Sequence, residues 1–104
     1  MREMETKPTS FARGVPPEER NGLYGIEDDL MEAGGGEPVV AVVVYAVDEV
    51  VHKEIAGERY PVVKVVHIEP LRDEKSVAAA LRLRDAAYKA RTGENALDLP
   101  EVDD

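Results

Sequence analysis

The clearest pattern in the chain is a pair of valine-rich segments that fits a β-hairpin. Residues 39–47 are almost all β-branched or aromatic, and residues 60–68 repeat this composition beyond Ala56-Gly57. Such residues favour extended strands, and a glycine-containing turn between two such runs is typical of a hairpin. We therefore predict a hairpin over residues 39–71.

Charged side chains indicate a register for this hairpin. Closing the turn on Ala56-Gly57 places Glu49 opposite Lys64 and Tyr45 opposite Ile68, which pairs opposite charges and apolar side chains. Pro61 then falls where its missing N–H is not needed, which is typical of an edge strand. A bulged turn that shifts the pairing by one residue stays open as an alternative.

A helix is predicted from about Asp73 to Thr92. Asp73 suits the N-cap, and Gly93 is a typical residue to end a helix. The apolar side chains fall on one broad face, which we expect to lie on the sheet. They are Val77, Ala80, Leu81, Leu83, Ala87 and Tyr88.

The predicted fold class is α+β, with a β-hairpin followed by one α-helix (ββα) over residues 38–93. The first strand is apolar on both faces, and one hairpin with one helix cannot cover both of its faces and both edges. We therefore expect oligomerisation, as a homodimer, to complete the sheet. The residues expected to form the oligomer strand are Val40, Val42 and Val44.

The two ends of the chain have a different composition. Residues 1–37 contain six of the eight glycines and show no sustained apolar period, so we expect them to be disordered in isolation. Within them, residues 23–31 fit a short amphipathic helix. Its side chains Tyr24, Ile26 and Leu30 either bind a partner or contact the chain's own core, and both interpretations stay open. Residues 94–104 are predicted to be an acidic tail.

Charge and cysteine content narrow the function classes. The 104 residues carry a net charge of −9 and no cysteine, which excludes disulfides, cysteine-based zinc sites and thiol catalysis. The acidity lies at the ends, because residues 1–36 carry eight acidic and four basic residues and residues 94–104 carry five acidic residues and no basic one. Residues 37–93 carry nine of each. The sequence has no run long and apolar enough to span a membrane, and we expect a cytoplasmic protein without membrane partners.

Residues that could perform catalysis are few. Only two serines are present, neither of them in a nucleophile elbow, and we expect a non-enzymatic protein without a cofactor. In the register above, Asp48, His67 and Glu69 share one sheet face and offer a set of ligands for a divalent metal. Ordinary exposed or oligomer-facing strand positions are the favoured interpretation of these residues, so a metal-dependent enzyme is the weaker alternative.

The predicted helix also carries basic residues in two rows. A stripe of this kind is needed to follow a phosphate backbone, although no aromatic platform accompanies it. A solvated face is the favoured interpretation, and nucleic-acid binding is an alternative function. The residues that would contact phosphates are Lys75, Arg82, Arg84, Lys89 and Arg91.

The tail contains a short motif, Leu97-Asp98-Leu99-Pro100. It resembles the peptide by which bacterial proteins bind the replication sliding clamp, except that Ala96 replaces the usual glutamine and Glu101 stands where a final hydrophobic residue is usual. The acidic end also resembles the ends by which single-stranded DNA-binding proteins recruit partners, without their terminal aromatic. An alternative is that Leu97 and Leu99 pack on the helix end.

The segments Val62–Leu71 and Tyr88–Gly93 (YKARTG) carry a broader resemblance. Over roughly residues 39–100, the chain is similar to small proteins of bacteriophages that infect actinobacteria. This resemblance implies a phage-encoded accessory protein, some of whose relatives are encoded among DNA-metabolism genes, and it assigns no site residues. We therefore expect an interaction protein whose acidic termini engage a host or phage protein of the replication or recombination machinery.

Overall fold

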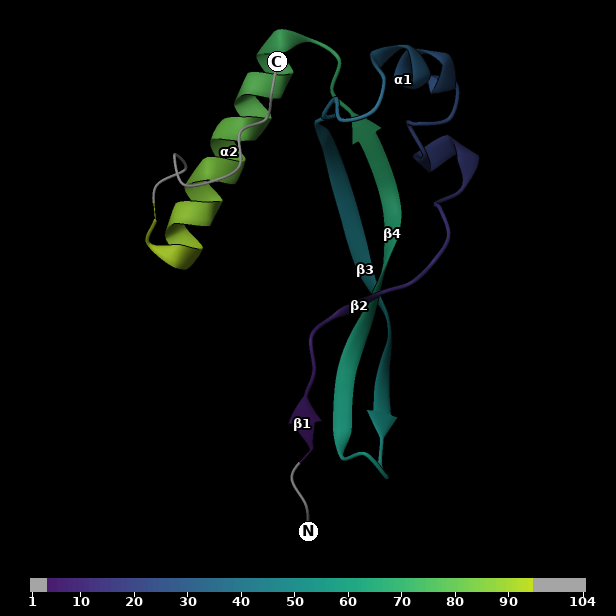
Figure 1. Ribbon diagram of the computed structural model, residues 1–104, viewed down its shortest axis with the longest axis vertical. Coiled ribbons are helices and arrows are strands. Elements are labelled where there is room, and N and C mark those ends of the chain that lie inside the picture. The colour runs from purple at the N-terminus through teal and green to yellow at the C-terminus, as the bar shows by residue number, and fades with distance from the viewer. Residues whose placement is uncertain (1–3, 95–104) are drawn as a thin grey trace. The chain divides into compact units, whose positions relative to one another are not determined.

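The protein has an α+β fold, as the sequence predicts (Figure 1). A computed structural model describes residues 4–94. Its elements are β1 (Glu5–Thr6), β2 (Ser10–Phe11), the 3-10 turn η1 (Glu18–Arg20), α1 (Glu27–Ala33), β3 (Ala41–Lys53), β4 (Glu58–Pro70) and α2 (Glu74–Thr92).

The chain divides into two compact units. One combines the segment ending at Asn21 with Val43–Ile68, and the other combines Gly22–Val42 with the segment that begins at Glu69. The first unit contains β1, β2, η1 and most of β3 and β4, whereas the second contains α1 and α2. Each unit is described separately below.

The predicted hairpin is confirmed as β3 and β4, two strands of 13 residues each. Figure 1 shows them paired and running in opposite directions. In the turn between them, the Gly57 N–H donates to the Glu54 carbonyl at 3.2 Å. Gly57 has a φ of 69°, a left-handed conformation that glycine adopts without steric cost and that is typical of a bulged hairpin turn.

The register differs from the one that pairs Glu49 with Lys64. Lys64 Nζ lies 3.4 Å from the Asp48 carboxylate, the neighbour of Glu49 on the opposite face of β3. Tyr45 contacts Phe11 with ring centroids 6.0 Å apart, and Phe11 pairs with Val63, so Tyr45 shares a face with Val63 and not with Ile68. Both contacts support the bulged alternative, because inserting one residue at Gly57 exchanges the two faces of one strand relative to the other.

The strict ββα prediction is wrong at the N-terminal side. The segment expected to be disordered in isolation contributes β1 and β2, which both run parallel to β4. They pair through their backbones, as when the Lys7 N–H donates to the Arg59 carbonyl at 2.9 Å and the Ala12 N–H to the Val63 carbonyl at 2.8 Å. Strands of two residues have no side-chain period, so the pattern of the sequence does not reveal them.

The two parallel pairings leave a gap at Pro61. β1 ends opposite Arg59 and β2 begins opposite Val62, so the residue without an N–H lies between them. The Lys7 side chain also forms ion pairs at this edge, with its Nζ 3.3 Å from the Glu58 carboxylate and 3.4 Å from the Glu5 carboxylate. Hydrogen bonds to Glu58 and then Glu5 raise the pKa of the Lys7 ammonium. β4 is therefore a central strand and not the edge strand that Pro61 indicated.

The predicted helix is confirmed as α2. The Asp73 carboxylate accepts from the Ser76 N–H at 2.9 Å, and this hydrogen bond lowers the pKa of Asp73. At the other end, Gly93 has a φ of 78° and its N–H donates to the Lys89 carbonyl at 2.7 Å. The apolar face is narrower than predicted, because Leu83 is 73% exposed and lies about a third of a turn from Val77 and nearly half a turn from Leu81.

Candidate protein-interaction surface

The most prominent surface feature is the row of apolar side chains on β3. Six of them are more than a third exposed, from 37% at Val43 to 65% at Val47. In contrast, Val62 of β4 is the only buried valine, leucine, isoleucine, methionine or aromatic side chain among the described residues. The exposed set, which we name the β3 surface, comprises Val42, Val43, Val44, Tyr45, Val47 and Val50.

One edge of β3 lacks a backbone partner within residues 4–94. β3 pairs with β4 alone, while β4 also pairs with β1 and β2. The Val40 carbonyl accepts from the Leu71 N–H at 2.8 Å, and the Glu54 carbonyl accepts from Gly57, so even-numbered residues direct their backbone groups toward β4. Because these groups alternate along a strand, the odd-numbered residues from Ala41 to Lys53 direct theirs toward the other edge.

The predicted oligomer strand residues lie at the start of this surface. Val42 and Val44 are 52% and 49% exposed, and Val40 is half-buried. Their backbone groups face β4, so only their side chains are available to another chain. The sequence missed the odd-numbered residues Val43, Tyr45 and Val47 as edge residues, and the signal that reveals them is the bulge at Gly57.

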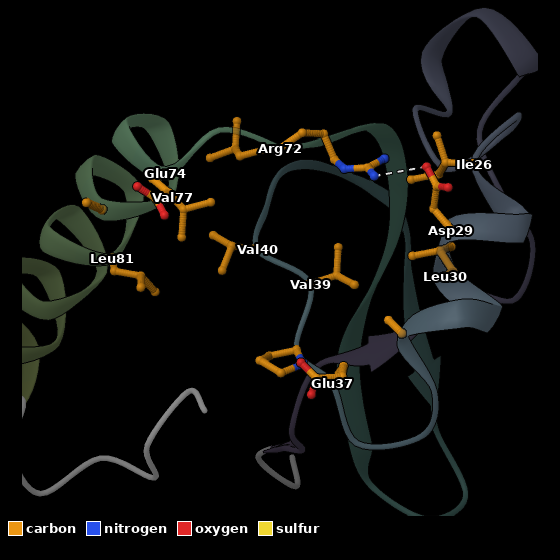
Figure 2. Close-up of a pocket in the computed structure, with 14 residues that line it drawn as sticks. Ile26, Asp29, Leu30, Glu37, Val39, Val40, Arg72, Glu74, Val77 and Leu81 are labelled. Carbon is orange, nitrogen blue, oxygen red and sulfur yellow. Dashed lines mark hydrogen bonds and ion pairs between the residues drawn. The ribbon is translucent and has the colours of Figure 1, made fainter. Parts of the chain in front are cut away.

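A second candidate surface is a groove in the unit that contains both helices (Figure 2). It has a volume of about 630 Å³, and Figure 2 shows Val39 on the side of Leu30 in α1 and Val40 on the side of Val77 and Leu81 in α2. Ile26, the N-cap residue of α1, also lines it, so two of the three predicted partner-binding side chains of residues 23–31 face their own chain. Tyr24 does not line the groove and is 61% exposed.

The rim of this groove carries an ion pair and further acidic groups. The Arg72 guanidinium lies 3.0 Å from the Asp29 carboxylate and connects α1 to the segment before α2. Glu37 and Glu74 also line the groove. The sequence pattern did not indicate this pair, because 43 residues separate its members.

The basic residues of α2 fall into two groups. Arg84 donates to the Asp85 carboxylate at 2.7 Å, and the Arg91 guanidinium lies 5.5 Å from the Tyr88 ring centre. Lys75, Arg82 and Lys89 have no ion pair or hydrogen bond with any residue from 4 to 94. Their spacing of seven residues places these three along one side of the helix, about 10 Å apart.

The candidate metal ligands do not come together. Asp48 shares its face with Lys64. Lys64 and His67 point to opposite faces, because they are three positions apart on the same strand. Glu69 lies on the face of His67, because the two residues are two positions apart on the same strand. No group of three or more histidine, cysteine or acidic side chains within residues 4–94 is arranged to hold a metal ion. The weaker alternative of a metal-dependent enzyme therefore loses its proposed site.

The motif Leu97-Asp98-Leu99-Pro100 lies outside the described residues. Among residues 4–94, neither helix is both long and apolar enough to cross a bilayer. Comparison of the chain with protein-family models, with curated proteins and with solved structures gives no match. The candidate site is therefore defined by its geometry: an apolar strand with one unpaired edge.

Proposed function

We propose that this chain is a non-enzymatic accessory protein that acts by binding other protein chains. The observation that carries the proposal is the exposure of the β3 surface, six apolar side chains on a strand whose second edge has no partner within residues 4–94. Proteins cover such strands, because an open apolar edge pairs with any available strand.

The partner proposed from the sequence belongs to the replication or recombination machinery of a phage or its host. The resemblance to small actinobacteriophage proteins and the clamp-binding pattern of Leu97, Asp98, Leu99 and Pro100 support this assignment. The net charge of the two ends supports it further, since acidic segments recruit proteins that work on nucleic acid without competing for the nucleic acid itself. In this proposal the β3 surface holds the folded unit in an assembly and the tail selects the partner.

Affinity capture from an actinobacterial lysate tests the proposal. We expect the intact chain to retain a defined set of proteins that a chain truncated after Gly93 does not retain. Leu97→Ala with Leu99→Ala is the finer variant, and binding to a purified bacterial sliding clamp is its readout. If the intact chain, its truncation and a Val42→Lys variant all retain the same background proteins, the protein-binding function is wrong.

The unpaired row on α2 favours nucleic-acid binding as a second candidate function. Lys75, Arg82 and Lys89 present three cations on one side of a helix with no acidic partner within residues 4–94. Such a row can follow a phosphate backbone. Its binding to nucleic acid weakens as salt is added, because the release of counterions then gains less entropy. In this case, Arg82→Ala with Lys89→Ala abolishes binding to duplex DNA and flattens the salt dependence, whereas Arg84→Ala has a smaller effect because Asp85 already neutralises it.

A further inference from the structure

We infer that the β3 edge is covered by β3 of a second copy, paired antiparallel about a two-fold axis at Val47. This inference rests on the proposed function, because it names the chain that covers the β3 surface. It is carried by the direction of the backbone groups along β3 and by the sequence of that strand.

The backbone limits the registers that two copies can adopt. Seven odd-numbered residues of β3, from Ala41 to Lys53, direct their N–H and carbonyl groups to the unpaired edge. Hydrogen-bonded pairs between two copies therefore join odd-numbered residues to odd-numbered residues. This condition excludes half of all antiparallel registers, those that place an odd-numbered residue opposite an even-numbered one.

One of the remaining registers overlaps the two strands over their whole length. With Val47 opposite itself, Ala41 of one copy lies opposite Lys53 of the other, Val43 opposite Val51 and Tyr45 opposite Glu49. All seven outward-facing residues of each strand then have a partner. Registers centred on other residues leave part of the 13-residue edge open.

The charges of β3 are compatible with this arrangement. The strand carries only Asp48, Glu49 and Lys53, so it has little net charge to attract an oppositely charged partner. In the register about Val47, Asp48 lies opposite Ala46 and Glu49 opposite Tyr45, and no two charges of the same sign lie opposite each other. Like charges directly opposite would destabilise the pairing, as they would with Asp48 or Glu49 at the centre.

The side chains at the edge favour a second copy over an unrelated strand. A two-fold interface requires a surface that is complementary to itself, and an apolar strand with alternating backbone donors and acceptors meets this requirement. The pairing joins the valines of the two β3 surfaces on both faces of one continuous sheet. A proline at one of the edge positions would remove a donor from this pairing, and β3 has no proline.

Cysteine cross-linking tests the register, since the native chain contains no cysteine. Residues opposite each other in a hydrogen-bonded pair have Cα atoms about 5.5 Å apart, within the range that a disulfide spans. We expect Val47→Cys to form a disulfide-linked dimer on mild oxidation. Val43→Cys and Val51→Cys should not cross-link alone, because two copies of residue 43 are about 26 Å apart, but an equimolar mixture of the two variants should.

Sedimentation of the intact chain at micromolar concentration provides the second measurement. We expect the parent to sediment with twice the mass of one chain and Val47→Pro to sediment with the mass of one chain. The circular dichroism spectrum of Val47→Pro should match that of the parent. A monomeric parent overturns the inference, and so does a dimer that cross-links through Val43→Cys alone. If the parent is monomeric but proteins are still captured from the lysate, also by Val47→Pro, the dimer inference fails and the proposed protein-binding function stands. Failure of the inference is therefore distinguishable from failure of the proposed function.

Discussion

β3 and β4 are equally long and both are rich in valine, yet they have very different surroundings. β4 pairs with β3 on one edge and with β1 and β2 on the other, and it contains the buried Val62. Among the residues that the structure describes, β3 pairs on one edge alone, and it exposes at least a third of every side chain of the β3 surface. Apolar composition therefore does not determine whether a strand is buried, because neighbours on both edges are needed as well.

Proline substitutions are expected to give the largest difference in stability between the two edges of β3. Ala46→Pro removes an N–H that faces β4, whereas Val47→Pro removes one that faces the unpaired edge. Both positions lie in the same extended strand, so the restriction of φ by the proline ring is matched. We expect Ala46→Pro to lower the free energy of unfolding by on the order of 3 kcal/mol, because a carbonyl of β4 loses its donor.

Val47→Pro should have less than half of this effect when both variants are melted at a concentration where the chain is monomeric. Thermal unfolding followed by circular dichroism measures the difference. Equal losses of stability in the two variants would show that both edges of β3 are engaged within one chain.

A smaller effect is expected from removing one valine from each strand. Val62→Ala deletes two methyl groups of the buried side chain and should cost about 2 kcal/mol of unfolding free energy. Val50→Ala deletes the same groups from a side chain that is 56% exposed and should cost less than about 1 kcal/mol in the monomer. Urea denaturation of the two variants measures both values, and a larger loss at Val50 would reverse the comparison.

The sequence predicts the two long strands and both α-helices of this protein and misses the two short strands. Continuous runs of β-branched residues predict β3 and β4, and Asp73 and Gly93 mark both ends of α2 through groups that bond the backbone directly. β1 and β2 are missed because they use backbone groups of ordinary residues, such as Lys7 and Ala12. Any extended segment offers such groups, so no side-chain pattern identifies them.

The register shows a different limit of sequence reasoning. Asp48 and Glu49 are adjacent and equally able to pair with Lys64, so opposite-charge matching cannot distinguish registers that differ by one residue. The conformation of Gly57 decides between them, and a glycine permits both turns. The prediction that Asp48, His67 and Glu69 share one face depended on the same register. In the bulged register, Asp48 lies on the opposite face from His67 and Glu69.

The smallest expected effect tests this register directly. In a double-mutant cycle of Asp48→Ala and Lys64→Ala, we expect a coupling of about 0.2–1 kcal/mol, as measured for other exposed ion pairs. A matched cycle of Glu49→Ala and Lys64→Ala should give no coupling, since Glu49 lies on the opposite face. Both cycles are measured by urea denaturation at low salt, with Lys64→Ala shared between them.

Added salt should reduce the Asp48 coupling further, because a pair with side chains 40% and 53% exposed is open to screening. A coupling to Glu49 that exceeds the coupling to Asp48 would restore the register without a bulge. The backbone groups of Tyr45 and Val47 would then face β4 in place of the unpaired edge. The even-numbered residues, among them Val42 and Val44, would form that edge, and a two-fold pairing through Val47 would lose its backbone hydrogen bonds.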